Sequence, residues 1–228
     1  MRLSRPLAGL AAAALLGTGA LSGCGLSDIQ AAPGVAAEVH GTEISVEEVD
    51  QLSATTCEVL RSNPELLGQG YTGSTVRDTV LAQLAQREIA DAIAAENDID
   101  GDPIYARAAQ QARLGLAQAD SEQLEEVLPV FASSSYLRAV VAQVVDPSLP
   151  ADADEATAMA AYQTYLSAWE AANPVTTNPL FTEVDFSAPQ QQRNELSVAV
   201  SDEAVELLTL DPAAVRLEER LPASQRCT

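Results

Sequence analysis

The chain has 228 residues, a formal charge of −21 and 47% hydrophobic residues, but only 4% aromatic residues. All twelve of its Lys or Arg positions are arginine, and 33 residues are acidic. This negative field repels phosphates and anionic lipid headgroups, which excludes nucleic-acid binding and electrostatic adhesion to a membrane. Partners are expected to be neutral, apolar or basic.

The first 23 residues have the pattern of an export signal. Two arginines are followed by an apolar run of small residues over 7–20, and the segment ends in Leu-Ser-Gly-Cys at Cys24. A membrane span needs about 20 apolar residues, so this shorter run favours a signal peptide. The tetrapeptide matches the lipobox of bacterial lipoproteins, and acylation of Cys24 would anchor the chain to the extracytoplasmic face of the cell membrane. The alternative is an ordinary signal with an incidental cysteine.

Cleavage before Cys24 would leave 205 residues, with ten arginines against 33 acidic residues and a formal charge of −23. A chain of this length can bury about 70% of its unfolded surface. Its alanine-rich, aromatic-poor composition favours helices that pack closely through small side chains. We expect a flexible tether over residues 24–34 and one mainly helical domain over residues 35–228.

Two cysteines remain in addition to Cys24, namely Cys57 and Cys227. Outside the cytosol such a pair usually oxidises, so a disulfide between them is predicted. The alternative is a pair of free buried thiols. A disulfide would hold the C-terminus beside the first helix.

The domain is predicted to begin with a short β-hairpin. Residues 35–39 and 42–44 are β-prone and flank a His-Gly turn at residues 40–41. Ser45, with Glu48 three positions later, has the pattern of a capping box that starts a helix.

Apolar spacing, caps and prolines then divide the rest of the chain into helices and extended segments. Ser74 is the expected cap of the second helix, and Pro129 is expected to interrupt or kink the fourth. Helices are predicted over residues 46–62, 74–96, 102–118, 120–129, 133–145, 152–172 and 201–210, with extended segments over 175–186 and 196–200.

The segment over residues 34–50 resembles the opening of SurA-type periplasmic chaperones and PrsA-type foldases. Those proteins begin with a short strand, an Asn-Gly turn and a capped helix, and His40 here replaces the asparagine. The likeness continues through residues 77–99, where an arginine precedes a Leu/Ile-rich amphipathic helix. In all, it covers about half of the mature chain.

A second match to these families lies at residues 175–185. The families follow their last long helix with Val-x-Val-Asn-Pro-Arg-Phe-Gly, and this chain has Val-Thr-Thr-Asn-Pro-Leu-Phe-Thr, departing at Leu180 and Thr182. The resemblance implies a mainly α, SurA-like lobe in which residues 35–39 pair with a strand at 196–200. A small antiparallel β element would then join the N- and C-terminal segments.

Residue types needed for catalysis are scarce. His40 is the only histidine, so Ser-His-Asp, Cys-His and multi-histidine zinc sites lack members, and we predict no catalytic residue, metal site or cofactor. Residues 68–73 match a dinucleotide fingerprint, but no buried strand precedes them. Residues 96–101 imitate half of a calcium loop, but Arg107 stands where a bidentate glutamate is needed.

The resemblance implies a membrane-anchored chaperone that binds unfolded or partly folded exported polypeptides without ATP, and not an enzyme. Residues 151–173 are too few for the parvulin isomerase domain of the foldases, so isomerase activity is not implied. One alternative is a non-enzymatic envelope lipoprotein acting as a structural partner or small-ligand binder, and another is an enzyme that uses carboxylates alone. Exposed apolar surface favours the chaperone, whereas an enclosed pocket favours the ligand binder.

Overall fold

The computed structural model describes residues 32–63, 73–150 and 152–181, together with Cys227. Within these residues the fold is mainly α with one small antiparallel sheet, as the sequence predicts. The predicted signal peptide, most of the tether, the strand at 196–200 and the helix at 201–210 lie outside the described residues. The elements are β1 (Val35–Val39), β2 (Thr42–Ser45), α1 (Val46–Ser62), α2 (Gly73–Glu96), α3 (Asp102–Gly115), α4 (Ser121–Val145), a 3-10 turn (Asp146–Ser148), α5 (Glu155–Ala172) and β3 (Thr176–Thr177).

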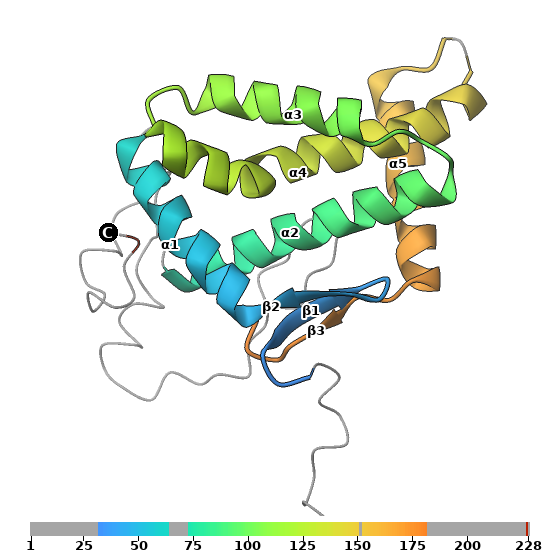
Figure 1. Cartoon of the computed structure of the whole chain (residues 1–228). Coiled ribbons are helices and arrows are strands. Elements are labelled where there is room, and N and C mark those ends of the chain that lie inside the picture. Colours follow the sequence, from blue (N-terminus) through green and yellow to red (C-terminus); the bar gives the residue numbers. More distant parts are fainter. Residues whose placement is uncertain (1–31, 64–72, 151, 182–226, 228) are drawn as a thin grey trace, which may run out of the picture.

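Helix α2 is the centre of the fold (Figure 1). The sheet lies against one side of α2, α4 packs against the other, and α3 packs on α4. Helix α1 contacts both α2 and α4 near one end of the body, and α5 stands at the opposite end. The described part of the chain is therefore layered as sheet, α2, α4 and α3.

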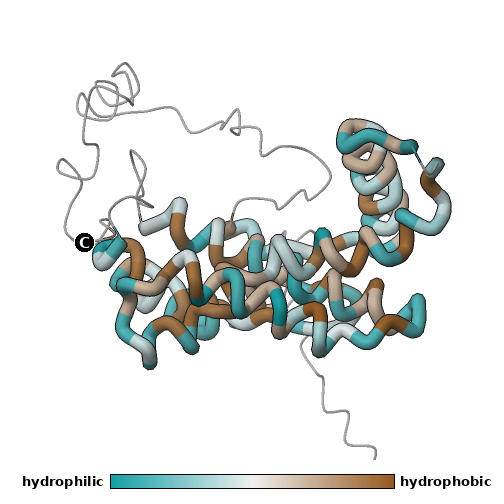
Figure 2. The backbone as a smooth tube through the Cα atoms, turned by 90° about the horizontal axis from the view of Figure 1, so that it is seen from above, coloured by the Kyte–Doolittle hydropathy of each residue, from teal (hydrophilic) through white to brown (hydrophobic). Residues whose placement is uncertain are grey.

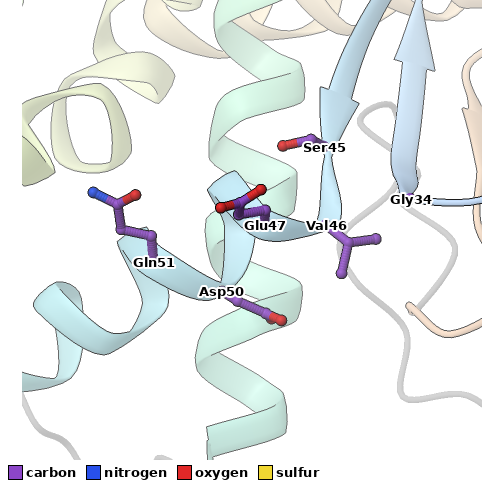
Figure 3. Close-up of a pocket in the computed structure, with 6 residues that line it drawn as sticks. All are labelled: Gly34, Ser45, Val46, Glu47, Asp50 and Gln51. Atoms are coloured by element: carbon purple, nitrogen blue, oxygen red, sulfur yellow. The ribbon is translucent and has the colours of Figure 1, made fainter.

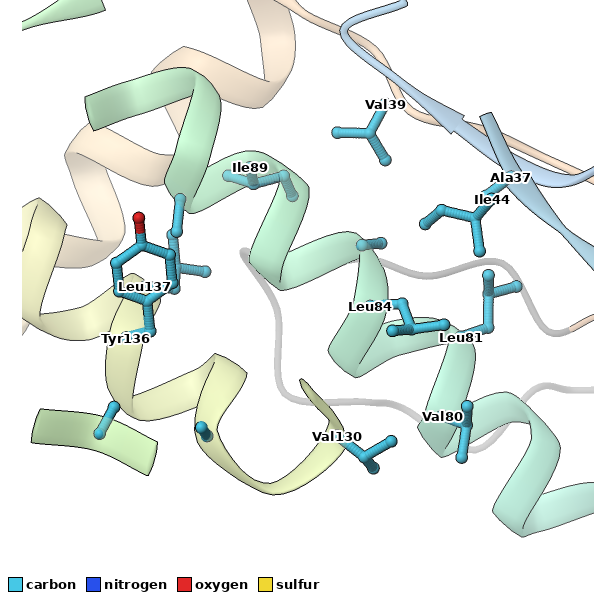
Figure 4. Close-up of a cluster of buried hydrophobic side chains, with 14 of the residues drawn as sticks. Ala37, Val39, Ile44, Val80, Leu81, Leu84, Ile89, Val130, Tyr136 and Leu137 are labelled. Atoms are coloured by element: carbon cyan, nitrogen blue, oxygen red, sulfur yellow. The ribbon is translucent and has the colours of Figure 1, made fainter. Parts of the chain in front are cut away.

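The hydrophobic core fills the space on both sides of α2 (Figure 4). Leu81 and Ile89 of α2 are fully buried, and Ile44 of the hairpin and Leu137 of α4 belong to the same cluster. Each such side chain contributes about 2 kcal/mol by leaving water. The wide apolar stripe that the sequence places on residues 74–96 is explained by this position between two layers.

The hairpin has the predicted two-residue turn. Val39 pairs with Thr42, and His40 and Gly41 both have positive φ, at 49° and 85°. Two successive residues of this kind are the mark of a type I′ turn, which favours Asn and Gly because most side chains strain in the left-handed region. His40 therefore occupies a backbone conformation that is uncommon for non-glycine residues but that histidine adopts more readily than most.

The second edge of β1 is occupied by β3. Ala37 pairs with Thr177 in an antiparallel register, giving the strand order β2-β1-β3. Asn178 extends this contact, since its backbone N–H donates to the Ala36 carbonyl at 2.8 Å and its side-chain amide donates to the Val35 carbonyl at 2.9 Å. Both edges of β1 are thus used, and β3 holds the place that the sequence assigned to residues 196–200.

Helix α1 begins and ends as predicted, and α5 ends at the predicted residue but begins at Glu155. Ser45 accepts a hydrogen bond from the Glu48 N–H at 3.0 Å, which caps α1. Asp154 accepts one from the Thr157 N–H at 2.8 Å and caps α5. A hydrogen bond with the Thr157 side chain, followed by this backbone bond, holds the pKa of the Asp154 carboxyl below its ordinary value. A side-chain oxygen satisfies a free N–H at each helix start.

Two other helix boundaries differ from the prediction. Helix α2 begins at Gly73, so Ser74 lies within its first turn, where the backbone is helical and does not suit an N-cap. Helix α3 ends at Gly115 and not near residue 118. Leu116 leaves the helix because its side chain is buried in a small cluster with Val59 and Val127.

The predicted break at Pro129 is wrong. Helix α4 runs without interruption through it, so the two helices expected over 120–129 and 133–145 are one. A proline inside a helix costs about 3 kcal/mol. Burial of apolar side chains on both sides of the proline, including Leu128 and Val130, offsets that cost, and the Ser133 hydroxyl donates to the Pro129 carbonyl.

One segment, Ser121–Ser148, is long and apolar enough to cross a membrane by length and composition alone. Half of its most apolar stretch of 18 residues is buried inside the domain, where α4 packs against α2 and α3. Its apolar character therefore matches that of a core helix.

A polar network joins α2, α3 and α4 beside the core. The buried hydroxyl of Tyr136 donates to Asp91 at 2.7 Å, and the Tyr136 ring meets Tyr105 edge-on with centroids 5.4 Å apart. Arg87 lies over the Tyr105 ring at 4.8 Å. Burial and the Asp91 carboxylate raise the pKa of Tyr136, so its hydroxyl stays a neutral donor. A Cβ atom at Gly101 would overlap this hydroxyl.

We expect Gly101→Ala to destabilise the protein by about 1–3 kcal/mol, the usual cost of overpacking. Tyr136→Phe removes the atom that the new Cβ would meet, so Gly101→Ala should cost much less in that background. Urea unfolding of the four proteins in this double-mutant cycle measures the coupling. If Gly101→Ala lowered the free energy of unfolding equally in the two backgrounds, the Tyr136 hydroxyl would not be what excludes a Cβ atom at position 101.

Candidate functional site

Helix α5 is rich in apolar residues but only partly covered. Of its 18 residues, Leu166 and Trp169 alone are buried. Met159, Tyr162 and Tyr165 are half-buried, and several of its alanines are exposed. We call Met159, Tyr162, Tyr165 and the exposed alanines of Glu155–Ala172 the α5 surface. Figure 2 shows α5 standing out from the rest of the helical body.

The α5 surface meets α4 along one side. Arg138 of α4 lies 3.7 Å from the Met159 sulfur, a contact between a guanidinium and a thioether. Burial raises the pKa of the Tyr162 hydroxyl, so this side chain stays neutral at every physiological pH. Charged groups beside the α5 surface include Arg138 of α4 and Glu170 of α5.

The C-terminal half of α5 is held against the hairpin and the end of α2 by a polar junction. We call His40, Glu96, Trp169 and Asn173 the hairpin junction. His40 Nδ1 lies 3.2 Å from Asn173 Oδ1, and His40 Nε2 lies 4.0 Å from Glu96 Oε1. The Trp169 indole N–H donates to Glu96 Oε2 at 2.9 Å, and its ring centroid is 6.1 Å from that of His40.

Further hydrogen bonds orient the members of the hairpin junction. The Asn173 amide nitrogen donates to the Trp169 carbonyl at 3.1 Å, which turns its oxygen toward His40. Beside the junction, the Asn97 amide nitrogen lies 3.4 Å from the Tyr165 hydroxyl. The junction brings together the chain's only histidine and only tryptophan, which are far apart in sequence.

The two predicted disulfide partners meet. The sulfur atoms of Cys57 and Cys227 are 2.09 Å apart, with Cα atoms at 5.1 Å and a sequence separation of 170 residues. Cys227 is buried, so this residue near the C-terminus lies beside α1, as the sequence implies. The predicted lipidation site, Cys24, lies outside the described residues.

Of the two ligand-like motifs in the sequence, only the one at residues 96–101 lies within the described residues. Most of the Gly-rich motif at 68–73 is not described. Residues 96–101 form the turn between α2 and α3, with Asp98 at a φ of 53°, and Arg107 donates to the Pro103 carbonyl at 3.1 Å. Among the residues described, no three His, Cys, Asp or Glu side chains converge on a possible metal position.

An open hollow lies where β1 and α1 begin (Figure 3). Its lining includes Glu47, Asp50 and Gln51, whose side chains point in different directions and not toward one another. Asp50 is already paired with Arg77 at 2.6 Å. This arrangement does not gather the convergent polar groups that orient a small ligand.

The hairpin junction was not predicted from the sequence, where His40 was placed in a turn and considered only as a catalytic or metal-binding group. The available signal is the residue type, because histidine stands here where the turn favours asparagine or glycine. Glu96, Trp169 and Asn173 gave no such signal, since helix ends commonly carry these residue types.

We expect reduction of the disulfide to lower the free energy of unfolding by up to about 4–5 kcal/mol, because the bond closes a loop of this length in the unfolded chain. Urea unfolding with and without a reductant measures the loss. Cys57→Ser is the control, since its unfolding should match that of the reduced protein and ignore the reductant. Identical curves for oxidised and reduced protein would contradict a structural role for the bond.

Comparison of the chain with protein-family models, curated proteins and solved structures finds no match. The resemblance to SurA-type chaperones therefore stays a prediction.

Proposed function

We propose that the protein is a membrane-anchored, extracytoplasmic chaperone-like lipoprotein that binds unfolded or partly folded exported polypeptides without ATP. The observation that carries this proposal is the α5 surface. Most residues of α5 are Ala, Met, Leu, Tyr or Trp, and only Leu166 and Trp169 among them are buried. Apolar side chains left accessible on one element are a common feature of binding sites.

The composition of the α5 surface suits partners of varied sequence. Methionine and tyrosine make apolar contacts that adapt to different shapes, and the alanines allow a bound chain to approach the helix backbone closely. Met159, Tyr162 and Tyr165 supply these contacts on one helix. A client is held through apolar side chains and not through a shape-specific pocket.

Charge gives a preference among clients. Asp152, Asp154 and Glu155 surround the start of α5, and the whole chain carries a formal charge of −21. Complementary charge speeds encounter and disfavours partners of like charge. Apolar segments flanked by Lys or Arg should therefore bind better than the same segments flanked by Asp or Glu.

The predicted anchor sets where this binding takes place. If Cys24 is acylated, the eleven residues of the tether extend at most about 40 Å from the bilayer. Clients would then be met close to the membrane that they have just crossed. The negative field keeps the domain itself from adhering to anionic lipid.

We expect the mature chain with Cys24→Ser to suppress aggregation of an unfolded exported protein at several-fold molar excess. Exchanging Met159 and Tyr162 for glutamine should weaken binding about tenfold, since about 1.4 kcal/mol of apolar contact is lost. Light scattering, and anisotropy of a labelled Lys-flanked apolar peptide, measure the two effects. The same peptide flanked by Asp should bind more weakly.

The matched control is Leu114→Gln, because Leu114 is a highly exposed apolar side chain on α3, which ends at the other end of the body from α5. This variant should keep full activity. Circular dichroism and Trp169 emission report whether each variant is folded. Equal losses in the control and the α5 variant, or no suppression by the parent chain, would reject the proposal.

A further inference from the structure

The chain has three cysteines, and the structure joins two that are far apart in sequence. Cys57 lies within α1, and Cys227 is the second-last residue of the chain. Cys227 is only 2% exposed and belongs to the main hydrophobic cluster, against which Cys57 packs. The bond is therefore part of the folded core, and the tertiary structure sets the correct partner of Cys57.

A competing pair of cysteines is closer in sequence. Cys24 precedes Cys57 by 33 residues, whereas the native bond joins residues separated by 170. In an unfolded chain, the probability that two residues meet falls with about the 3/2 power of their separation. Cys57 therefore meets Cys24 about ten times more often than it meets Cys227. Export that starts at the N-terminal signal adds to this bias, because Cys24 and Cys57 cross the membrane before Cys227 does.

We propose that acylation of Cys24 has a second role besides anchoring, which is to block the thiol that would otherwise capture Cys57. Lipid transfer to Cys24 then has to precede oxidation of the exported chain. The native bond forms second, once Cys227 has also crossed the membrane. This inference rests on the predicted acylation of Cys24 and is independent of the proposed chaperone function.

The two reactions use the cysteine sulfur in incompatible ways. In the first, the Cys24 sulfur displaces the phosphate headgroup of a phospholipid, so an S–C bond forms, a C–O bond breaks and the thiol proton leaves with the phosphate. In the second, the Cys57 and Cys227 thiols lose two protons and two electrons, and an extracytoplasmic thiol oxidase takes up the electrons as its own disulfide is reduced to a dithiol. A thioether has no thiolate and cannot take part in this exchange, so acylation removes Cys24 from the competition.

Mispairing would affect both ends of the domain. A bond between Cys24 and Cys57 leaves the Cys227 thiol without a partner and removes the covalent link between α1 and the C-terminal end. It also closes the shorter loop, which stabilises the folded state less than the longer loop does. Early acylation therefore protects the native core as well as supplying the anchor.

The test compares three full-length chains exported by bacteria that have an extracytoplasmic thiol oxidase. The first is the parent chain. The second carries an ordinary signal peptide cleaved before residue 24, so that the Cys24 thiol is exported free. The third is this second chain with Cys24→Ser, the matched control that takes the same export route without the thiol. Mass spectrometry of unreduced peptides identifies the joined cysteines, and the mass of the N-terminal peptide reports acylation.

The parent chain and the Cys24→Ser control should contain the Cys57–Cys227 bond. Soon after synthesis, the chain with free Cys24 should contain several-fold more of the Cys24–Cys57 bond than of the native bond. Native pairing as complete as in the control would overturn the protective role, even with an acylated parent chain. An unmodified Cys24 in the parent chain would overturn it together with the predicted anchor.

Discussion

The pairing of β1 with β3 is the constraint on which the rest of the arrangement depends. Strand β1 opens the domain, and β3 follows its last described helix, so two segments about 140 residues apart share one sheet. Asn178 continues the pairing with two hydrogen bonds to the start of β1. Because β1 also packs on α2, this contact fixes the end of α5 relative to the central helix.

The exposure of α5 follows from this anchoring. Its C-terminal end is held by the sheet and the hairpin junction, where Trp169 is buried. The rest of the helix packs chiefly on α4, which covers one side and leaves Met159 and Tyr162 half-buried. A helix secured mainly at one end can keep apolar side chains available, and His40 of the hairpin contacts that same end through Asn173.

Local signals in the sequence were sufficient for much of the fold. The Ser45 cap, the His-Gly turn and the Cys57–Cys227 pair all depend on chemistry within a few residues or on cysteine count. Pro129 was misread because tertiary packing on both sides of it outweighs its local effect. The hairpin junction was not predictable, since nothing local in the sequence connects His40 with Glu96 or Trp169. The strand that pairs with β1 was predicted at residues 196–200, but Thr176–Thr177 occupies that edge of β1.

Hydrogen exchange at the Asn178 backbone amide tests the central claim most directly. This N–H donates to the Ala36 carbonyl at 2.8 Å, so its protection from exchange reports whether β1 and the segment after α5 are paired. We predict slow exchange at Asn178, comparable with that of the amides shared by β1 and β2. Exchange as fast as in an unstructured peptide would show that β1 and the segment after α5 are not paired.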